Sequence, residues 1–287
     1  MQNTANNTEA QAEQLNNHIS PYTKVLKDYF PSREAILLEA QALTQKNQAR
    51  KRLLKNTVLG SVLSLFLLTW LIDPIIKSDY LNTQIGQQIS YALADGSKVT
   101  LNTNSIVKSE IRLRSRRLEL VKGEALFNVA HEWRSFTVQA NNTNIRDIGT
   151  VFNVHNTLDG AIVTVLDGTV EVTTRDKTYL LNKKQTLSTS ANLEPLITKN
   201  VTEDANTTMA WQQGKLLFDG TPLSKVVTEL QRYRKAPITL NDAKVGKLRI
   251  SGAYDIKGIE SLIDTLPMSV AVKVNRQADG SVIIKAR

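Results

Sequence analysis

The sequence predicts a mostly β protein that is anchored by one transmembrane helix and ends in a small α+β module. An uncharged apolar run covers residues 56–72, and short apolar-alternating runs recur between turn residues from Ile89 to about Ser190. After Lys215, two helical stripes alternate with short strands. The 287 residues allow about two ordinary domains. With 41% hydrophobic and 22% charged residues, the composition is typical of a folded chain.

The composition excludes several kinds of functional site. The chain has no cysteine, which removes disulfides, thiolate zinc sites, iron–sulfur clusters and cysteine nucleophiles. Its three histidines, His18, His131 and His155, are widely spaced along the chain. We therefore expect no bound metal and no cofactor.

The apolar run NTVLGSVLSLFLLTWLI has no polar stripe, which favours a membrane span over a buried core helix. Five basic residues between Lys46 and Lys55 precede it, so the positive-inside bias places residues 1–55 in the cytoplasm and the bulk of the chain across the membrane. We predict a transmembrane helix over residues 56–76. Much of the net charge of +9 lies beside this helix, which favours contact with the membrane and argues against direct binding of nucleic acid.

Residues 1–55 predict a short helical segment. Ser20-Pro21 is typical of a helix start, and Pro31-Ser32 predicts the start of a second helix. The apolar side chains that follow these starts share a helix face and are candidate contacts for a cytoplasmic partner: Tyr22, Val25, Leu26, Tyr29, Ile36 and Leu43. An amphipathic spacer on the inner leaflet is the alternative interpretation.

Residues 84–190 predict a β domain, either a sandwich or a barrel. Ala94-Asp95-Gly96-Ser97 indicates a turn between two strands. Asp167-Gly168 joins two alternating runs, VTVL and TVEV, and predicts a two-residue hairpin.

The hydrophobic period changes in the C-terminal part of the chain. Residues 191–210 are polar and predict a linker. In residues 211–287, apolar side chains recur at helical spacing over 223–230 and 259–266, and Ala278-Asp279-Gly280 indicates a hairpin. The order of strands and helices predicts a compact α+β module.

Several motifs, in this order, resemble the FecR family. They are LADGSKVTLNTNS (93–105), RRLELVKGEALFNV (116–129), IGTVFNVH (148–155) and VTVLDGTVEV (163–172). The later stretches LLFDGTPLSKVVTELQRYRKAPITL (216–240) and LRISGAYDI (248–256) are similar to that family's secretin/TonB short N-terminal (STN)-like module. The resemblance implies a jelly-roll-like β domain followed by a βαβ-type module, both in the periplasm.

The resemblance also implies a function. FecR-family proteins are single-pass inner-membrane anti-sigma regulators of iron or siderophore uptake in Gram-negative bacteria. A loaded outer-membrane TonB-dependent receptor contacts the periplasmic part through its signalling domain. The cytoplasmic part then releases or activates an extracytoplasmic-function sigma factor. The alternative is a membrane-anchored β domain that binds an envelope polymer or a secretion component and has no sigma partner.

An STN-like module has a small sheet, whose edge strands can accept a strand from the receptor. The candidate strands are Lys215–Phe218, Leu248–Ser251 and Val270–Val274. The candidate receptor contacts are Leu216, Phe218, Leu230, Arg232, Arg234, Leu248 and Ile250.

Catalysis on a small-molecule substrate is not expected, because the chain has neither a Gly-x-Ser-x-Gly elbow nor a phosphate loop. Asp147 and His155, with a nearby serine or threonine, are residue types that a hydrolase triad uses. Their spacing in the sequence does not establish the geometry that a triad needs. One internal reaction is a hypothesis. In Gly149-Thr150 the threonine hydroxyl follows a glycine carbonyl, and its attack on that carbonyl carbon would cleave the chain.

Overall fold

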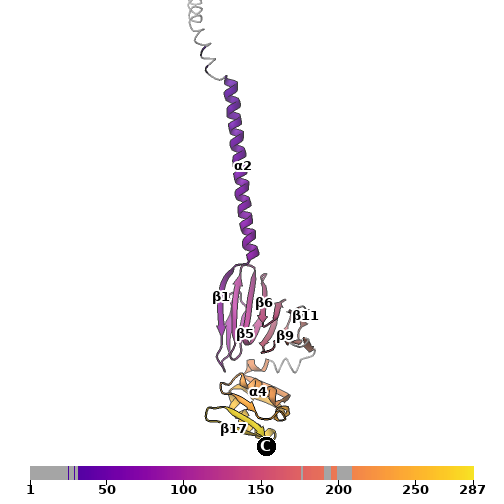
Figure 1. Ribbon diagram of the computed structural model, residues 1–287. Coiled ribbons are helices and arrows are strands. Elements are labelled where there is room, and N and C mark those ends of the chain that lie inside the picture. Colours follow the sequence, from indigo (N-terminus) through magenta and orange to yellow (C-terminus); the bar gives the residue numbers. More distant parts are fainter. Residues whose placement is uncertain (1–24, 26–28, 30–31, 176, 191–194, 199–208) are drawn as a thin grey trace, which may run out of the picture. The chain divides into compact units, whose positions relative to one another are not determined.

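The computed structural model describes residues 25, 29, 32–175, 177–190, 195–198 and 209–287. The chain divides into two compact units, Met1–Leu71 and Ile72–Arg287. The second unit holds a β domain, made of strands β1 to β13, and a C-terminal module of residues 209–287 (Figure 1).

The first unit contains one long helix, α2 (Arg33–Ile72). Ser32 caps its start, since the Ala35 backbone N–H donates to Ser32 Oγ at 3.2 Å, and this confirms the predicted helix start. The helix is long and apolar enough to cross a membrane, and all of its side chains are exposed. At 1.5 Å per residue its 40 residues reach about 60 Å, twice the hydrocarbon thickness, so only its apolar second half can lie in lipid.

The helix ends at Ile72, four residues before the predicted end of the span at residue 76. Asp73 has a φ of 50°, and Pro74 has no backbone N–H, so neither residue continues the helix. The Asp73 carboxylate accepts hydrogen bonds from the Arg114 backbone N–H at 2.8 Å and from Ser115 Oγ. These bonds stop the helix and start the β domain, and the chain enters a strand at Ile75.

The β domain is one curled sheet of 13 strands among the described residues. Its strands are β1 (Ile75–Asn82), β2 (Ile89–Ala92), β3 (Lys98–Leu101), β4 (Ile106–Arg112), β5 (Ser115–Asn128), β6 (Ser135–Ala140), β7 (Thr143–Asp147), β8 (Val151–Asn156), β9 (Ala161–Asp167), β10 (Thr169–Thr174), β11 (Lys177–Asn182), β12 (Thr186–Ser188) and β13 (Leu196–Thr198). The last strand lies within the stretch 191–210 that the sequence predicts as a linker.

Strand β5 belongs to both halves of the curled sheet. Its first part pairs with β4 and with β6, and its second part pairs with β3 and with β8. Gly123 lies at the change, with a φ of +84°. A Cβ there would lie 2.7 Å from Ser105 Cα, so only glycine lets the strand bend at this point. The two halves enclose one core, in which Phe127 stacks on Phe152 with ring centroids 5.2 Å apart.

The predicted turn at Ala94–Ser97 is confirmed, because β2 pairs antiparallel with β3. The predicted hairpin at Asp167-Gly168 is wrong. Strand β9 pairs with β8 and β12, whereas β10 pairs with β7 and β11. The Asp-Gly turn instead carries the chain from one half of the sheet to the other, since the buried side chains of β9 and β10 belong to one core shared by both halves.

The C-terminal module contains two small sheets and two helices. Its elements are η1 (Ala210–Gln213), β14 (Lys215–Pro222), α4 (Leu223–Gln231), β15 (Ile238–Leu240), η2 (Val245–Lys247), β16 (Arg249–Asp255), η3 (Ile256–Gly258), α5 (Ile259–Ser269), β17 (Val272–Arg276) and β18 (Val282–Ala286). Both predicted helices are present, and the predicted hairpin at Ala278–Gly280 joins β17 to β18. The helices bury their apolar stripes in the module's own core. The predicted fold class, mostly β with an α+β end, is confirmed.

Candidate functional site

A buried carboxylate lies where the β domain meets the C-terminal module. Glu124, on β5, is 3% exposed. Its Oε1 accepts a hydrogen bond from Asn153 Nδ2 at 2.8 Å, and its Oε2 accepts one from Asn102 Nδ2 at 2.8 Å. Arg232 Nη2, just after α4, donates to the same Oε2 at 2.5 Å. We call these four residues and Tyr233 the Glu124 network. The negative charge comes from the β domain and the positive charge from the module.

Further hydrogen bonds in this network also join the two parts. Asn102 Nδ2 donates to Tyr233 Oη at 2.9 Å, and Tyr233 Oη lies 3.1 Å from Asn102 Oδ1. Thr103 Oγ1 donates to the Arg232 carbonyl oxygen at 3.1 Å. The second arm of the Arg232 guanidinium is held by Glu229 Oε1 at 2.6 Å. Because both ends of the arginine are paired, the end of α4 is held in one position against the β domain.

The contact around the network is not closely packed. A cavity of about 240 Å³ adjoins Glu124 and is lined from both parts of the second unit, with Ile162 and His155 on one side and Trp211 and Phe218 on the other. Apolar contact is incomplete at this point. Hydrogen bonds and charge therefore make a large contribution to docking of the module.

The electrostatic environment lowers the pKa values of both Glu124 and His155, so the two groups carry different charges at neutral pH. Burial by itself would raise the pKa of Glu124, but the Arg232 guanidinium, with smaller contributions from His155 and the Asn102 amide, holds it below its usual value. Burial lowers the pKa of His155, and the nearby Arg232 lowers it further, against the opposing effect of the Glu124 and Glu229 carboxylates. The site therefore holds an ionised glutamate beside a neutral histidine at neutral pH.

Acidification is expected to destabilise the second unit. Both pKa values are lower in the folded chain than in the unfolded chain, so unfolding takes up protons as the pH falls. The His155 contribution is complete above its unfolded pKa of about 6.5 and is lost as pH falls toward its lowered folded value. We expect the melting temperature to fall between pH 7.5 and 5.5. The decrease should be smaller for His155→Gln and unchanged for His131→Gln, whose side chain is exposed.

Most of the predicted receptor contacts lie in the module's core or in ion pairs. Four of them lie in the module's core and are unavailable as surface side chains: Leu216, Phe218, Leu230 and Ile250. Leu248 is half-buried against the same core. Arg232 is bound by Glu124, and Arg234 is bound by Glu260 Oε1 at 2.5 Å. The apolar stripe packs in the module's core, Arg234 forms an ion pair within the module, and Arg232 joins the module to the β domain.

Some strands of the same module have an edge that pairs with no other strand among the described residues. Strands β14 and β16 pair only with each other, and β17 pairs only with β18, within the described residues. These strands contain most of the three stretches that the sequence singles out as candidate edges. A partner strand would therefore add through main-chain hydrogen bonds.

The predicted self-cleavage bond lies in a turn between β7 and β8. Gly149 has a φ of +84°, and its N–H donates to Asp147 Oδ2 at 3.0 Å. Thr150 is 4% exposed, and its hydroxyl donates to Asp147 Oδ1. Gly168 packs against this turn so closely that a Cβ there would lie 2.3 Å from the Gly149 carbonyl oxygen. No hydrogen bond joins Asp147 to His155 in the described part of the chain, so the two residues do not form a triad.

The predicted cytoplasmic contacts lie partly outside the described residues. Tyr22 and Leu26 lie outside the residues that the structure describes. Val25 and Tyr29 are helical and exposed. Ile36 and Leu43 lie seven residues apart on α2, about two helical turns, and are 52% and 56% exposed.

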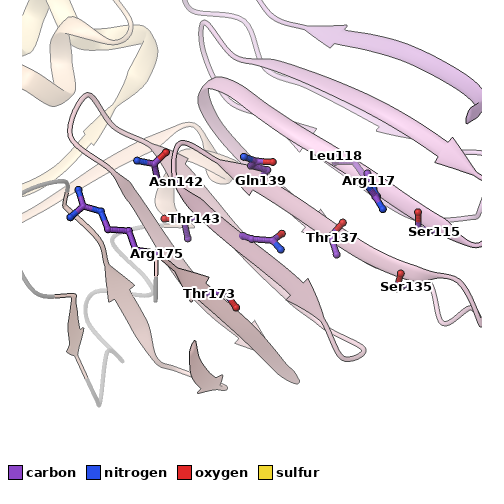
Figure 2. A pocket seen from close by; sticks show the side chains of 11 residues that line it. Ser115, Arg117, Leu118, Ser135, Thr137, Gln139, Asn142, Thr143, Thr173 and Arg175 are labelled. Carbon is purple, nitrogen blue, oxygen red and sulfur yellow. The ribbon is translucent and has the colours of Figure 1, made fainter. Parts of the chain in front are cut away.

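A polar hollow of about 750 Å³ lies on the outer face of the sheet (Figure 2). Figure 2 shows Thr137 and Gln139 from β6, Thr173 from β10, and the two arginines Arg117 and Arg175 around it. None of its lining residues is aromatic, although aromatic rings are the usual stacking surface for sugars. This hollow gives no specific support to binding of an envelope polymer. Among the described residues, no group of three or more His, Asp or Glu side chains is arranged to hold a metal ion.

Sequence reasoning missed the acidic and amide members of the Glu124 network. Glu124 follows Gly123 inside an apolar run. Strict alternation that starts from Leu118 and Leu120 puts position 124 on the core face and position 123 on the opposite face. The bend at Gly123 changes the alternation, so Glu124 and Ala125 are both buried. A charged residue beside a glycine within an apolar strand was the available signal.

Comparison with known proteins agrees with this architecture. Residues 79–171 match the model of the family described as FecR protein. Two crystal structures described as a "putative anti-sigma factor" from Parabacteroides distasonis ATCC 8503 are similar to the chain. One, at 2.50 Å resolution, is 27% identical, covers 74% of this chain and 100% of its own, and has a TM-score of 0.64. The other, at 1.65 Å, is 26% identical, covers 73% and 99%, and has the same TM-score.

No curated protein sequence matches the chain significantly. The family match covers most of the β domain, including the Gly149-Thr150 turn and Glu124. The structural similarity extends well beyond the family match, because it covers nearly three quarters of the chain. The chain therefore contains a FecR-family domain at residues 79–171.

Proposed function

We propose that this chain is a single-pass inner-membrane regulator that controls a cytoplasmic extracytoplasmic-function sigma factor in response to an outer-membrane TonB-dependent receptor. The observation that supports this best is the similarity, over 74% of the chain, to a protein described as a "putative anti-sigma factor". The FecR-family domain and the long apolar helix before it agree with such a regulator.

The membrane orientation follows from the charge around α2. Its first half carries basic residues up to Lys55, and its second half is uncharged to Ile72. The positive-inside bias then leaves residues 1–55 in the cytoplasm and places the β domain and the module in the periplasm. We assign the β domain to the sheet of β1 to β13, residues 75–198, and the STN-like module to residues 209–287.

The module is the proposed receptor-binding part. The signalling domain of the receptor would add a strand to an unpaired edge, either of β17 or of the β14–β16 pair. Uptake of iron or of a siderophore is the process that we propose is regulated, on the basis of the family resemblance. The buried positions Leu216, Phe218, Leu230 and Ile250 would position these edges without contacting the receptor.

The sigma-binding claim is tested by co-purification of the full chain with its candidate sigma factor. Changing Ile36 and Leu43 to aspartate places charges on one face of α2, and we expect the recovered sigma factor to fall by about tenfold or more, a loss of roughly 1.4 kcal/mol in binding free energy. Leu38→Asp is the matched control. Leu38 is 66% exposed and lies about 200° from Ile36 around the same helix.

Equal recovery with the Ile36/Leu43 double variant and with Leu38→Asp would show that this face is not the binding surface. Failure to recover any sigma factor with the unaltered chain would contradict the regulator itself. That result would favour the alternative, a membrane-anchored β domain whose partner is an envelope polymer or a secretion component.

We also propose self-cleavage between Gly149 and Thr150, because a carboxylate lies against the threonine hydroxyl. Asp147 would accept the hydroxyl proton as Thr150 Oγ1 attacks the Gly149 carbonyl carbon. The new C–O bond replaces the broken C–N bond, and the departing Thr150 nitrogen takes up a proton. Water then hydrolyses the ester, which leaves a Gly149 carboxylate and restores the Thr150 hydroxyl.

A further inference from the structure

An exposed tryptophan lies at the end of the β domain where the chain enters from α2. Trp133, in the β5–β6 connection, is 70% exposed, which is unusual for so large an apolar ring. Strands β5 and β6 run parallel, and Ser115 pairs with Ser135 at their starts. Figure 2 shows these two serines at the same end of the sheet. Trp133 precedes Ser135 by two residues, so it extends beyond this end.

Hydrogen bonds connect this end to the first residues after α2. Ser115 Oγ and the Arg114 N–H both donate to the Asp73 carboxylate. Arg112 Nη1 donates to the Asp73 carbonyl oxygen at 3.5 Å, and Arg134 Nη1 donates to the Arg112 carbonyl oxygen at 3.4 Å. The Arg134 guanidinium carbon lies 6.0 Å from the centre of the Trp133 ring. Asp73 directly follows Ile72, the last helical residue.

Other exposed apolar side chains share this end. Ile75 pairs with Arg112 at the start of β1 and is 49% exposed, and Ile76 is 63% exposed. Ile148 follows β7, whose end lies beside the start of β6, and is 55% exposed. Arg114 is exposed in the turn between β4 and β5. We call these five residues, Ile75, Ile76, Arg114, Trp133 and Ile148, the Trp133 end.

We propose that the Trp133 end binds the surface of the membrane that α2 crosses, on its periplasmic side. If α2 spans the bilayer, Ile72 lies near the periplasmic interface. The next residue, Asp73, is hydrogen-bonded to Arg114 and Ser115, so this corner of the β domain is held next to the end of the helix. Tryptophan is enriched at that depth, because its ring is apolar and its N–H is polar. The Arg114 guanidinium can pair with lipid phosphate groups. The occupant of this surface is therefore phospholipid.

This arrangement would hold the β domain against the membrane and restrict its freedom about the short Asp73-Pro74 connection. The Gly149-Thr150 bond follows Ile148 directly, so the proposed cleavage site would also lie near the lipid surface. The inference rests on the proposed function, since it requires α2 to be a membrane span.

The chain contains its own reporters for this inference, because its three tryptophans lie in different environments. Trp70 is on α2, Trp133 is at the exposed end, and Trp211 is 3% exposed in the C-terminal module. The full chain is reconstituted in vesicles of phosphatidylethanolamine and phosphatidylglycerol whose acyl chains carry bromine near the headgroups. Emission is compared for the variants W70F, W133F and W70F/W133F. Trp211 is unaltered in all three, so the buried core is not disturbed.

The difference between W70F and W70F/W133F reports Trp133. We expect its emission to fall by about half or more in the brominated vesicles, and iodide in the water to quench it only weakly, as for a ring at the interface. The difference between W133F and W70F/W133F reports Trp70, which should also be quenched by the bromolipid.

The two failures are distinguishable. If Trp70 is quenched by bromolipid but Trp133 is quenched only by iodide, the inference is overturned and the membrane span remains. If bromolipid quenches neither tryptophan, α2 does not lie in the membrane, and both the proposed function and this inference are overturned.

Discussion

Replacing Glu124 with glutamine is expected to remove about 3–5 kcal/mol of stability from the second unit, because it breaks a buried ion pair from one side. The Arg232 guanidinium would remain buried with only Glu229 as a charged partner, and an amide nitrogen would face the Asn102 or Asn153 donor. For a unit of this size the melting temperature should fall by roughly 10 °C. Calorimetry should also resolve separate unfolding of the β domain and the module, since their main polar connection is lost.

Glu119→Gln is the matched control for this prediction. Glu119 lies on the same strand, is exposed, and should change the melting temperature by less than about 2 °C. The double variant E124Q/R232M should be more stable than the sum of the two single losses, because no unpaired charge remains. A Glu124→Gln protein that melts like Glu119→Gln would show that the Glu124 network does not dock the module.

Replacing Thr150 with alanine is expected to abolish cleavage between Gly149 and Thr150, because the attacking hydroxyl is gone. Thr150→Ser keeps a hydroxyl and should still be cleaved. Asp147→Asn removes the proton acceptor and should slow the reaction by about a hundredfold, the usual contribution of a general base. The measurement is the mass of the products on a denaturing gel and by mass spectrometry, with fragments of residues 1–149 and 150–287 expected from the unaltered chain.

The two fragments should remain together under native conditions. Strand β8, after the cleaved bond, pairs with β5 before it, and β10 pairs with β7 in the same way. Thr178→Ala is the control, since this threonine lies on the exposed side of β11. An unaltered chain that stays whole after prolonged incubation, or equal cleavage of Thr150→Ala, would rule out the mechanism.

The hairpin prediction at Asp167-Gly168 shows the limit of local pattern. The residues are correct for a tight turn, and Gly168 does have a φ of +81°. The same two residues serve equally well to carry a chain between two halves of a sheet. The buried sides of β9 and β10 belong to one core, and strand pairing far along the chain decides the partners of each strand. Nothing within ten residues of the turn contains that information.

The candidate site shows a similar division. The stripe of Leu223, Val226, Val227 and Leu230 predicts α4 correctly, because helical period depends only on neighbours in the sequence. The role of Arg232 was not predictable in this way. Its partner Glu124 lies 108 residues earlier, and no pattern among neighbouring residues links the two side chains.

Neighbouring residues were sufficient to place the apolar helix, the succession of short strands and the two helices of the C-terminal module. Hydrophobic period and turn chemistry depend on residues that are close in the sequence, so both can be read from the order of the amino acids. Folding in three dimensions was needed to choose strand partners, to bury Glu124 against Arg232, and to bring Trp133 to the end of the domain that holds Asp73. These are contacts between distant parts of the chain, and their energy depends on burial and dielectric environment, which exist only once the core has formed.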